Sequence, residues 1–188
     1  MQSDAELITK SLAGDGEAFV EMIGRHETVV GAYLTRRAGR EAAEDLLGEV
    51  WVAAYESRSA YDLAFPDARP WLFGVALNRL RRYWQSRPAE DLVPDLASVG
   101  AGWDPWPGVD GRVAVEAALR TPLALLPPQE REVLTLVAWE DLTVADAARI
   151  LGMPAGTARR LLHQARQALR AAPGIAALMT ANTVKESK

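Results

Sequence analysis

Apolar residues recur every three or four positions along most of the chain, the spacing that places them on one face of an α-helix. Alternation of apolar and polar residues never runs long enough to indicate a β-strand. Glycines and prolines separate the successive apolar patterns and mark where helices end. The pattern therefore predicts an all-α protein. The expected helices span residues 4–13, 16–37, 41–56, 70–86, 111–126, 128–139, 143–151 and 155–171.

Helical periodicity fails over two stretches of the chain. The stretch at residues 57–69 is short and carries turn-forming residues, so we expect a loop inside one domain. Residues 88–110 are rich in proline, glycine and aspartate, which indicates an extended linker between domains. We therefore expect two small helical domains joined by a linker. The boundaries are residues 1–87 for a helical bundle, 88–110 for the linker, 111–172 for a helix-turn-helix domain and 173–188 for a short C-terminal extension.

The segment at residues 143–171 has the form of a helix-turn-helix. Thr143 is suited to cap a short helix, and Gly152 and Pro154 interrupt the pattern before a longer helix begins. Residues 149–170 include five arginines and no acidic residue, which favours contact with DNA. A solvated helix of an ordinary bundle is the alternative, although such helices usually mix charges of both signs. The polar face of the longer helix carries Thr157, Arg159, Arg160, His163, Gln164, Arg166, Gln167 and Arg170.

The helix expected at residues 70–86 carries a second basic face. Residues 79–87 include four arginines and no acidic residue. Aromatic rings interleaved with arginine suit the unstacked bases and the backbone of single-stranded DNA. The alternative, which we favour for any one ring taken alone, is that the aromatic residues belong to the core. The aromatic residues are Trp71, Phe73, Tyr83 and Trp84, and the residues expected to point outward are Asn78, Arg79, Arg81, Arg82 and Gln85.

Charge and composition support contact with a polyanion at two separate places. The 188 residues carry a net charge of −4, which argues against a free-standing, non-specific DNA binder. The acidic excess is concentrated in residues 88–121, however, between the two arginine clusters. The chain holds no cysteine, no basic-then-apolar leader and no apolar run of the roughly 20 residues that span a bilayer. We expect a cytoplasmic protein without membrane insertion.

Residue types that perform catalysis form no recognisable set. The two histidines, His26 and His163, fall in different expected domains. The sequence contains no glycine-rich phosphate loop, metal-ligand spacing or nucleophile elbow. We therefore expect no enzyme activity, no cofactor and no metal site, and we interpret His26 as a partly exposed helix residue.

Three stretches of sequence, taken in order, resemble a known family. The N-terminal part contains AEDLLGEVWVAAYES and then RPWLFGVALNRLRRYW. The C-terminal part contains LLPPQEREVLTLVAWEDLTVADAARILGMPAGTARRLLHQARQAL, with its Leu-Pro-Pro, a Gly-x-Pro turn and Gly156-Thr157. Together they resemble the extracytoplasmic-function (ECF) group of bacterial RNA polymerase sigma factors in its two-domain form. The resemblance covers nearly all of residues 4–172 apart from the linker.

The resemblance implies a protein that binds core RNA polymerase, recognises the −35 and −10 promoter elements and helps to melt the promoter. It implies that the helix-turn-helix domain reads the −35 major groove through Thr157, Arg159, Arg160, His163, Gln164 and Arg166. It implies that the helical bundle reads the −10 element through a specificity loop at residues 61–68, and through Tyr61, Asp62, Asn78, Arg81, Arg82 and Gln85. It implies that an acidic face contacts the β′ clamp coiled coil through Glu44, Asp45 and Glu49. The implied partners are core polymerase (β′ clamp and β), promoter DNA and an anti-sigma factor.

Three positions depart from the ECF pattern. Gly48 stands where the family usually has glutamine, which leaves the affinity for polymerase open. Leu161 replaces a commonly basic residue, so one expected phosphate contact is missing. The Thr121-Pro122 pair interrupts a helix that is often continuous and leaves the start of the second domain open.

Two other functions remain compatible with parts of the sequence. A dimeric helix-turn-helix repressor or activator would explain residues 122–172 equally well, but it gives no role to Asp45 or to the arginine-rich helix before the linker. A protein-interaction module with a degenerate DNA-binding fold would bind polymerase without opening promoters.

Overall fold

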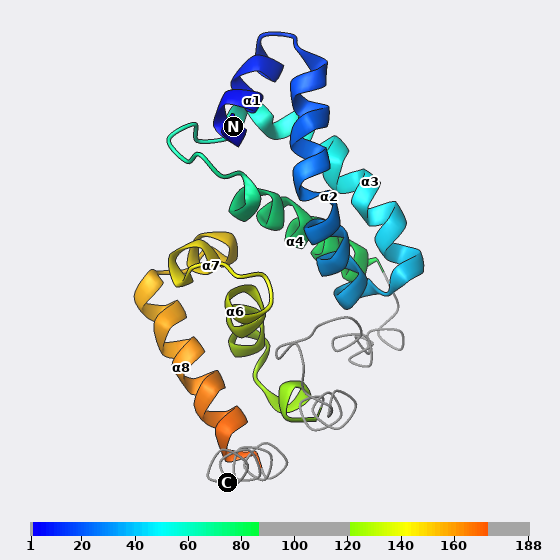
Figure 1. Ribbon diagram of the computed structural model, residues 1–188. Helices are drawn as coiled ribbons and strands as arrows, with labels where there is room; N and C mark the ends of the chain where they lie inside the picture. Colours follow the sequence, from blue (N-terminus) through cyan, green and yellow to red (C-terminus); the bar gives the residue numbers. More distant parts are fainter. Residues whose placement is uncertain (1, 87–120, 173–188) are drawn as a thin grey trace, which may run out of the picture. The chain divides into compact units, whose positions relative to one another are not determined.

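Helices account for all regular structure in residues 2–86 and 121–172, the ranges that this computed structural model describes (Figure 1). The chain divides into two units, Met1–Ser98 and Val99–Lys188. The first holds α1 (Asp4–Leu12), α2 (Gly16–Ala38), α3 (Arg40–Ser57), the 3-10 helix η1 (Arg58–Ala60) and α4 (Arg69–Gln85). The second holds a helical segment at 121–125, then α6 (Pro128–Ala138), α7 (Val144–Leu151) and α8 (Ala155–Ala171). The prediction of two all-α domains is confirmed.

Several expectations concern residues outside the described ranges. They are the linker at 88–110, the start of the C-terminal domain at 111–120 and the extension at 173–188. The domain boundaries therefore remain predictions. Within the described part, the helical segment at 121–125 includes Pro122.

The N-terminal unit is built around α2, which packs against α1, α3 and α4. The rings of Tyr33 and Phe73 meet edge to face in its core, with centroids 5.1 Å apart, and both side chains are fully buried. A carboxylate oxygen of Asp15 accepts the N–H of Ala18 and caps α2, as expected for aspartate at a helix start. Gly39 alone connects α2 to α3 with φ at +80°, a conformation that L side chains rarely adopt.

The segment between α3 and α4 is more ordered than the sequence indicated. Residues 57–69 were expected to form a loop, but Ser57 belongs to α3 and η1 follows directly. The α4 helix begins one residue earlier than predicted, with Arg69 first and Pro70 second. The N–H of Arg69 donates to the side chain of Asp67 (2.9 Å), which gives this extra residue a hydrogen-bond partner.

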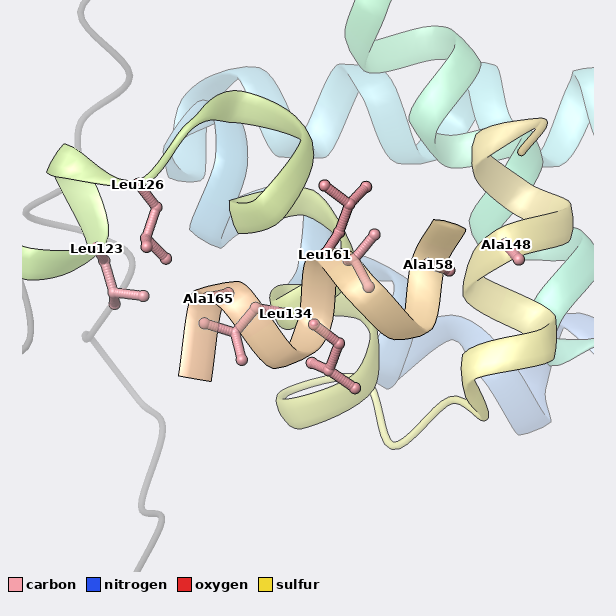
Figure 2. Packing of buried hydrophobic residues seen from close by; sticks show 9 residues of the cluster. Leu123, Leu126, Leu134, Ala148, Ala158, Leu161 and Ala165 are labelled. Atoms are coloured by element: carbon pink, nitrogen blue, oxygen red, sulfur yellow. The ribbon is translucent and has the colours of Figure 1, made fainter. Parts of the chain in front are cut away.

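An apolar cluster in the described part of the C-terminal unit is formed by the segment before α6 and by α6, α7 and α8 (Figure 2). Its buried members are Leu123, Leu126, Val133, Leu134, Ala148, Ala158, Leu161, Leu162 and Ala165. Leu161 is only 6% exposed. This position therefore faces the core, and its apolar side chain stabilises the unit in place of the phosphate contact that a basic residue would make.

Arg131 fixes the segment before α6 onto that helix. Its guanidinium donates to the carbonyl oxygens of Ala124 (2.8 Å) and Leu126 (2.9 Å). These carbonyls lie at and just beyond the end of the helical segment at 121–125, where they have no partner within that helix. Arg131 thus links α6 to the segment that carries Leu123 and Leu126.

Candidate DNA- and polymerase-binding surfaces

The turn between α7 and α8 sets the direction of the second helix. The hydroxyl of Thr143 accepts the N–H of Asp146 (3.1 Å) and caps α7, as the sequence predicted. Gly152 ends α7 with φ at +68°, and the N–H of Met153 donates to the carbonyl of Ala148 (3.0 Å). Three residues, ending with Pro154, connect the end of α7 to the first residue of α8. The turn between the two helices is therefore short.

The α8 helix has one buried and one exposed face. Ala158, Leu161, Leu162 and Ala165 are buried in the cluster already described. Of the six residues predicted to read the −35 element, Arg159, Arg160, His163, Gln164 and Arg166 are exposed and Thr157 is half-buried. The structure therefore places the predicted residues on one side of one helix, with no acidic residue among them.

Two of these residues are paired in the free protein. Nη1 of Arg160 donates to Oε1 of Gln164 at 3.1 Å, one helical turn further along. Both side chains are exposed, so the bond holds the guanidinium and the amide side by side at the surface. Arginine can donate two hydrogen bonds to a guanine edge, and glutamine can donate one and accept one at an adenine edge.

The α4 helix presents the second predicted face. Asn78, Arg81, Arg82 and Gln85 are all exposed. The neighbouring aromatic residues behave differently, because Phe73 is fully buried and the Trp71 ring packs edge to face on Tyr61, with centroids 5.2 Å apart. The structure thus supports the core interpretation for Phe73, while the polar residues of α4 remain available to a ligand.

The loop at residues 61–68, called here the 61–68 loop, is shaped by its own side chains. The hydroxyl of Tyr61 donates to the carbonyl of Phe65 (2.5 Å), and Oδ1 of Asp62 accepts the N–H of Ala64 (3.0 Å). Tyr61 is 8% exposed, whereas Asp62 is exposed. Leu63 and Phe65 are also exposed, at 47% and 40%, although both are apolar. The loop therefore offers apolar and acidic groups to a ligand from a fixed backbone.

The predicted acidic face lies on α3. Glu44, Asp45 and Glu49 are all exposed, and Gly48 is exposed between them. Val52, one turn beyond Gly48, is 59% exposed. The face therefore combines three carboxylates with a glycine, which has no side chain, and one apolar side chain. This composition is suited to a basic protein surface.

Replacement of Gly48 by alanine is expected to raise the free energy of unfolding by about 0.5–1 kcal/mol, because glycine inside a helix has excess freedom in the unfolded chain. A Cβ built at Gly48 meets no atom within 4 Å, so the methyl group fits. Urea unfolding of the full chain measures the change. Gly39→Ala is the matched control: its φ of +80° is strained for alanine, so that variant is expected to lose stability. A loss of stability in Gly48→Ala would contradict the prediction.

A buried polar cluster that the sequence did not predict joins α1, α2 and the 61–68 loop. Asp4 is 6% exposed, and its Oδ2 is bonded to Nε2 of His26 (2.7 Å) and to the N–H of Ala68 (3.0 Å). Its Oδ1 accepts from Nη1 of Arg25 at 3.2 Å. The expectation that His26 is partly exposed is wrong, since it is 8% exposed and is bonded to Asp4 of α1. The partners lie 22 and 64 residues from Asp4 in sequence, so no local pattern could reveal the cluster.

The charge state of Asp4 follows from these partners. Burial alone would raise the pKa of this carboxyl group, but hydrogen bonds from His26 and from the Ala68 N–H lower the pKa below its ordinary value of 3.8. The carboxylate is therefore ionised at neutral pH and only accepts hydrogen bonds. Nε2 of His26 must carry the proton that joins them.

Asp4, His26 and Asp67 form the one group of possible metal ligands found in the described ranges. Their ligand atoms lie within 4.8 Å of one another. Both oxygens of Asp4 already accept hydrogen bonds, and the guanidinium of Arg25 would repel a cation there. The donor set is thus explained by hydrogen bonding.

None of the helices in the described ranges is long and apolar enough to cross a membrane.

Comparison with protein families assigns both units. Residues 22–93 match the model of Sigma-70 region 2, and residues 116–169 match that of Sigma-70, region 4. These two regions, in this order on two helical units, define a sigma factor of the sigma-70 class, a protein that recognises promoters to initiate transcription.

Individual relatives narrow this class. The ECF RNA polymerase sigma factor SigM of Mycobacterium tuberculosis (strain H37Rv) is 32% identical over 178 residues, which cover 89% of this chain and 83% of SigM. The ECF RNA polymerase sigma factor SigF of Caulobacter vibrioides is 32% identical over 171 residues, 87% of this chain and 89% of SigF. The chain belongs to the ECF sigma factors.

Solved structures support the fold. CnrH, solved in complex with the cytosolic domain of CnrY, has a TM-score of 0.64 and 23% identity, and the match covers 95% of this chain and 97% of CnrH. The sigma factor RpoE of Bartonella quintana, solved with the anti-sigma factor NepR, has a TM-score of 0.59 and 19% identity over 81% of this chain and 94% of RpoE. Sigma factors are generally non-enzymatic regulators that act on RNA polymerase.

Proposed function

We propose that the two exposed polar faces divide promoter recognition between them. The exposed face of α8 reads the −35 major groove, and the exposed face of α4 together with the 61–68 loop holds the non-template strand of the −10 element. The observation that carries the proposal is the exposure of arginine and amide side chains on one face of each helix, while the opposite faces are buried. We also propose the domain boundaries given above, with residues 88–110 as the linker.

The α4 face suits single-stranded DNA. Amide groups of Asn78 and Gln85 pair with base edges, and the guanidinium groups of Arg81 and Arg82 contact phosphates. Flipping a base out of the stack costs a few kcal/mol, which contacts with the loop and the polymerase together offset. The buried ring of Tyr61 acts through the shape of the loop rather than by stacking on a base.

The acidic face of α3, made of Glu44, Asp45 and Glu49, docks on the basic coiled coil of the β′ clamp in this proposal. The chain performs no chemistry itself, because the polymerase forms the RNA bonds, and it works in the cytoplasm, where the polymerase is. An anti-sigma protein as negative regulator belongs to the same proposal; the complex of RpoE with NepR is the precedent among the structural relatives.

Run-off transcription tests the proposal as a whole. Purified core RNA polymerase is supplied with a genomic promoter library, with and without this protein. Start sites that appear only with the protein, and that share sequences near −35 and −10, are the expected result. Binding of palindromic duplex DNA without polymerase, with no new start sites, would instead support a dimeric repressor. Polymerase binding without promoter opening would support an interaction module.

Arg160→Ala is expected to relax recognition at one −35 base pair. A bidentate arginine–guanine contact is worth about 1–3 kcal/mol of discrimination, or roughly 5- to 150-fold in relative promoter strength. Transcription from −35 variants at saturating core polymerase measures this ratio. Arg170→Ala, which removes an exposed arginine of the same helix outside the predicted set, is the control and should leave the ratio unchanged. An equal loss on every −35 variant would rule out a base-reading role for Arg160.

A further inference from the structure

The 61–68 loop is fastened to the first residue of α1 by two hydrogen bonds. The backbone N–H of Asp4 donates to the carbonyl of Pro66 (2.9 Å), and the side-chain Oδ2 of Asp4 accepts the N–H of Ala68 (3.0 Å). Asp4 is the donor in the first bond and the acceptor in the second, and its two partners, Pro66 and Ala68, flank Asp67 in the sequence. Figure 1 shows the loop between η1 and α4 passing beside the start of α1. A single residue near the N-terminus therefore holds the C-terminal end of the loop.

The carboxylate that makes the second bond is itself held in place. Nε2 of His26 contacts the same oxygen at 2.7 Å, and Arg25 binds the other oxygen at 3.2 Å. Arg25 is fixed in turn by the carbonyl of Gln2 (2.7 Å) and the carboxylate of Glu21 (2.5 Å). The side chain of Asp4 is 7% exposed, so water does not compete freely for these partners. The carboxylate has little freedom to turn away from the loop.

The same contact completes the start of α4. Ala68 precedes α4 and supplies no side-chain cap, and the second residue of the helix is Pro70, which has no N–H. Oδ2 of Asp4 accepts the N–H of Ala68, and Oδ1 of Asp67 accepts that of Arg69. Both acceptors are anionic and lie at the positive end of the helix dipole. Asp4 thus acts as a capping group supplied from a distant part of the chain.

The other end of the loop is held differently. The hydroxyl of Tyr61 donates to the carbonyl of Phe65, and its ring packs on Trp71 of α4. Exposed Leu63 and Phe65 lie between this contact and the contacts of Asp4. The position of the exposed side chains therefore depends on both ends, and the hydrogen bonds of Asp4 hold the C-terminal end.

We propose that Asp4 is a positioning residue for −10 recognition, fixing the C-terminal end of the 61–68 loop and the start of α4 while His26 and Arg25 orient its carboxylate. The inference rests on the proposed role of the loop. It assigns Asp4 and His26 an effect on which −10 base is preferred, without contact between either residue and DNA.

The test compares Asp4→Ala and Asp4→Asn with the unaltered protein, each assembled with core polymerase. Alanine removes the acceptor of the buried Ala68 N–H, whereas asparagine keeps an acceptor and loses the charge. Transcription is measured on promoters varied singly at −10 and, separately, at −35. Asp4→Ala is expected to lower the preference for the best −10 base by about three- to tenfold, Asp4→Asn by less, and neither is expected to change the −35 preference. Glu27→Gln, an exposed carboxylate on α2, is the matched control.

Amide hydrogen exchange of the full chain gives a second measurement that needs no polymerase. The N–H of residue 68 is expected to exchange faster in Asp4→Ala, while amides inside α2 and α3 stay protected. His26→Leu removes the donor that orients the carboxylate but leaves Asp4 in place, and is expected to shift the −10 preference in the same direction. If Asp4→Ala does not fold, Asp4→Asn and His26→Leu decide the question by the same criterion.

Two results would overturn the proposal. One is a uniform loss on all promoters, or an equal change at −10 and −35, which would mean that Asp4 only stabilises the fold. The other is faster exchange of the Ala68 N–H with an unchanged −10 preference. Asp62→Ala in the same assay separates this failure from that of the proposed function. If Asp62→Ala changes the −10 preference and Asp4→Ala does not, the loop reads DNA without needing Asp4; if neither variant changes it, the role of the loop itself is refuted.

Discussion

Leu134→Ala is expected to destabilise the C-terminal unit by about 2–5 kcal/mol, the range for a buried leucine truncated to alanine. Leu134 is 4% exposed and lies in the cluster that joins α6, α7 and α8 (Figure 2). Small helical domains have stabilities of only a few kcal/mol, so this loss is a large part of the total. The −35-dependent part of transcription should fall steeply, while assembly with core polymerase through the N-terminal unit persists.

Urea unfolding of the full chain, followed by circular dichroism, measures the loss. Leu125→Ala is the matched control, because Leu125 has the same side chain, lies in the same unit and is 79% exposed. That variant is expected to stay within about 0.5 kcal/mol of the original protein. Equal destabilisation by both variants would show that the cluster is not the core that holds α8 in place.

Most of the helical architecture could be predicted from local patterns. Caps at Asp15 and Thr143 and the break at Gly152 depend on residues within a few positions of one another, and the structure contains each of them. The outward faces of α4 and α8 also follow from helical periodicity, because the spacing that buries one face exposes the other. This is why Arg81 and Arg160 are exposed as predicted.

Features that depend on contacts between distant residues could not be predicted in this way. Periodicity indicates that a residue is buried but not what it packs against, so the pairing of Phe73 with Tyr33 appears only in the fold. His26 looked like an ordinary helix residue because its partner, Asp4, belongs to another helix. The 61–68 loop has no period at all, and its shape depends on side-chain bonds such as the one from Tyr61 to Phe65.

The two kinds of feature have different consequences for function. A single substitution on a helix face is expected to change the base preference of the protein at one position, because each side chain points outward from a rigid support. The 61–68 loop is not part of a helix, and its position depends on its own bond from Tyr61 to Phe65 and on the bond to Asp4. Specificity at −10 is therefore expected to respond to substitutions at buried polar positions that never touch DNA, and specificity at −35 to substitutions on the surface of α8.

Asp45→Arg is expected to weaken assembly with core polymerase by at least about tenfold, equivalent to roughly 1.4 kcal/mol, because it places like charges together at the proposed β′ contact. Asp45 is exposed, so its replacement disturbs no core packing. On α3 it lies one turn from both Glu41 and Glu49, and an arginine there forms favourable i,i+4 pairs with these carboxylates. The fold is therefore retained, and the loss can be assigned to the interface.

Titration of labelled protein with core polymerase at several salt concentrations measures the effect. Because the contact is electrostatic, the difference between Asp45→Arg and the original protein should shrink as salt rises. Glu27→Arg makes the same change of net charge at an exposed position of another helix, α2, and controls for long-range steering. Equal weakening by both variants would mean that Asp45 contributes only through the net charge of the protein. Unchanged assembly of Asp45→Arg would refute the proposed docking of α3 on the clamp.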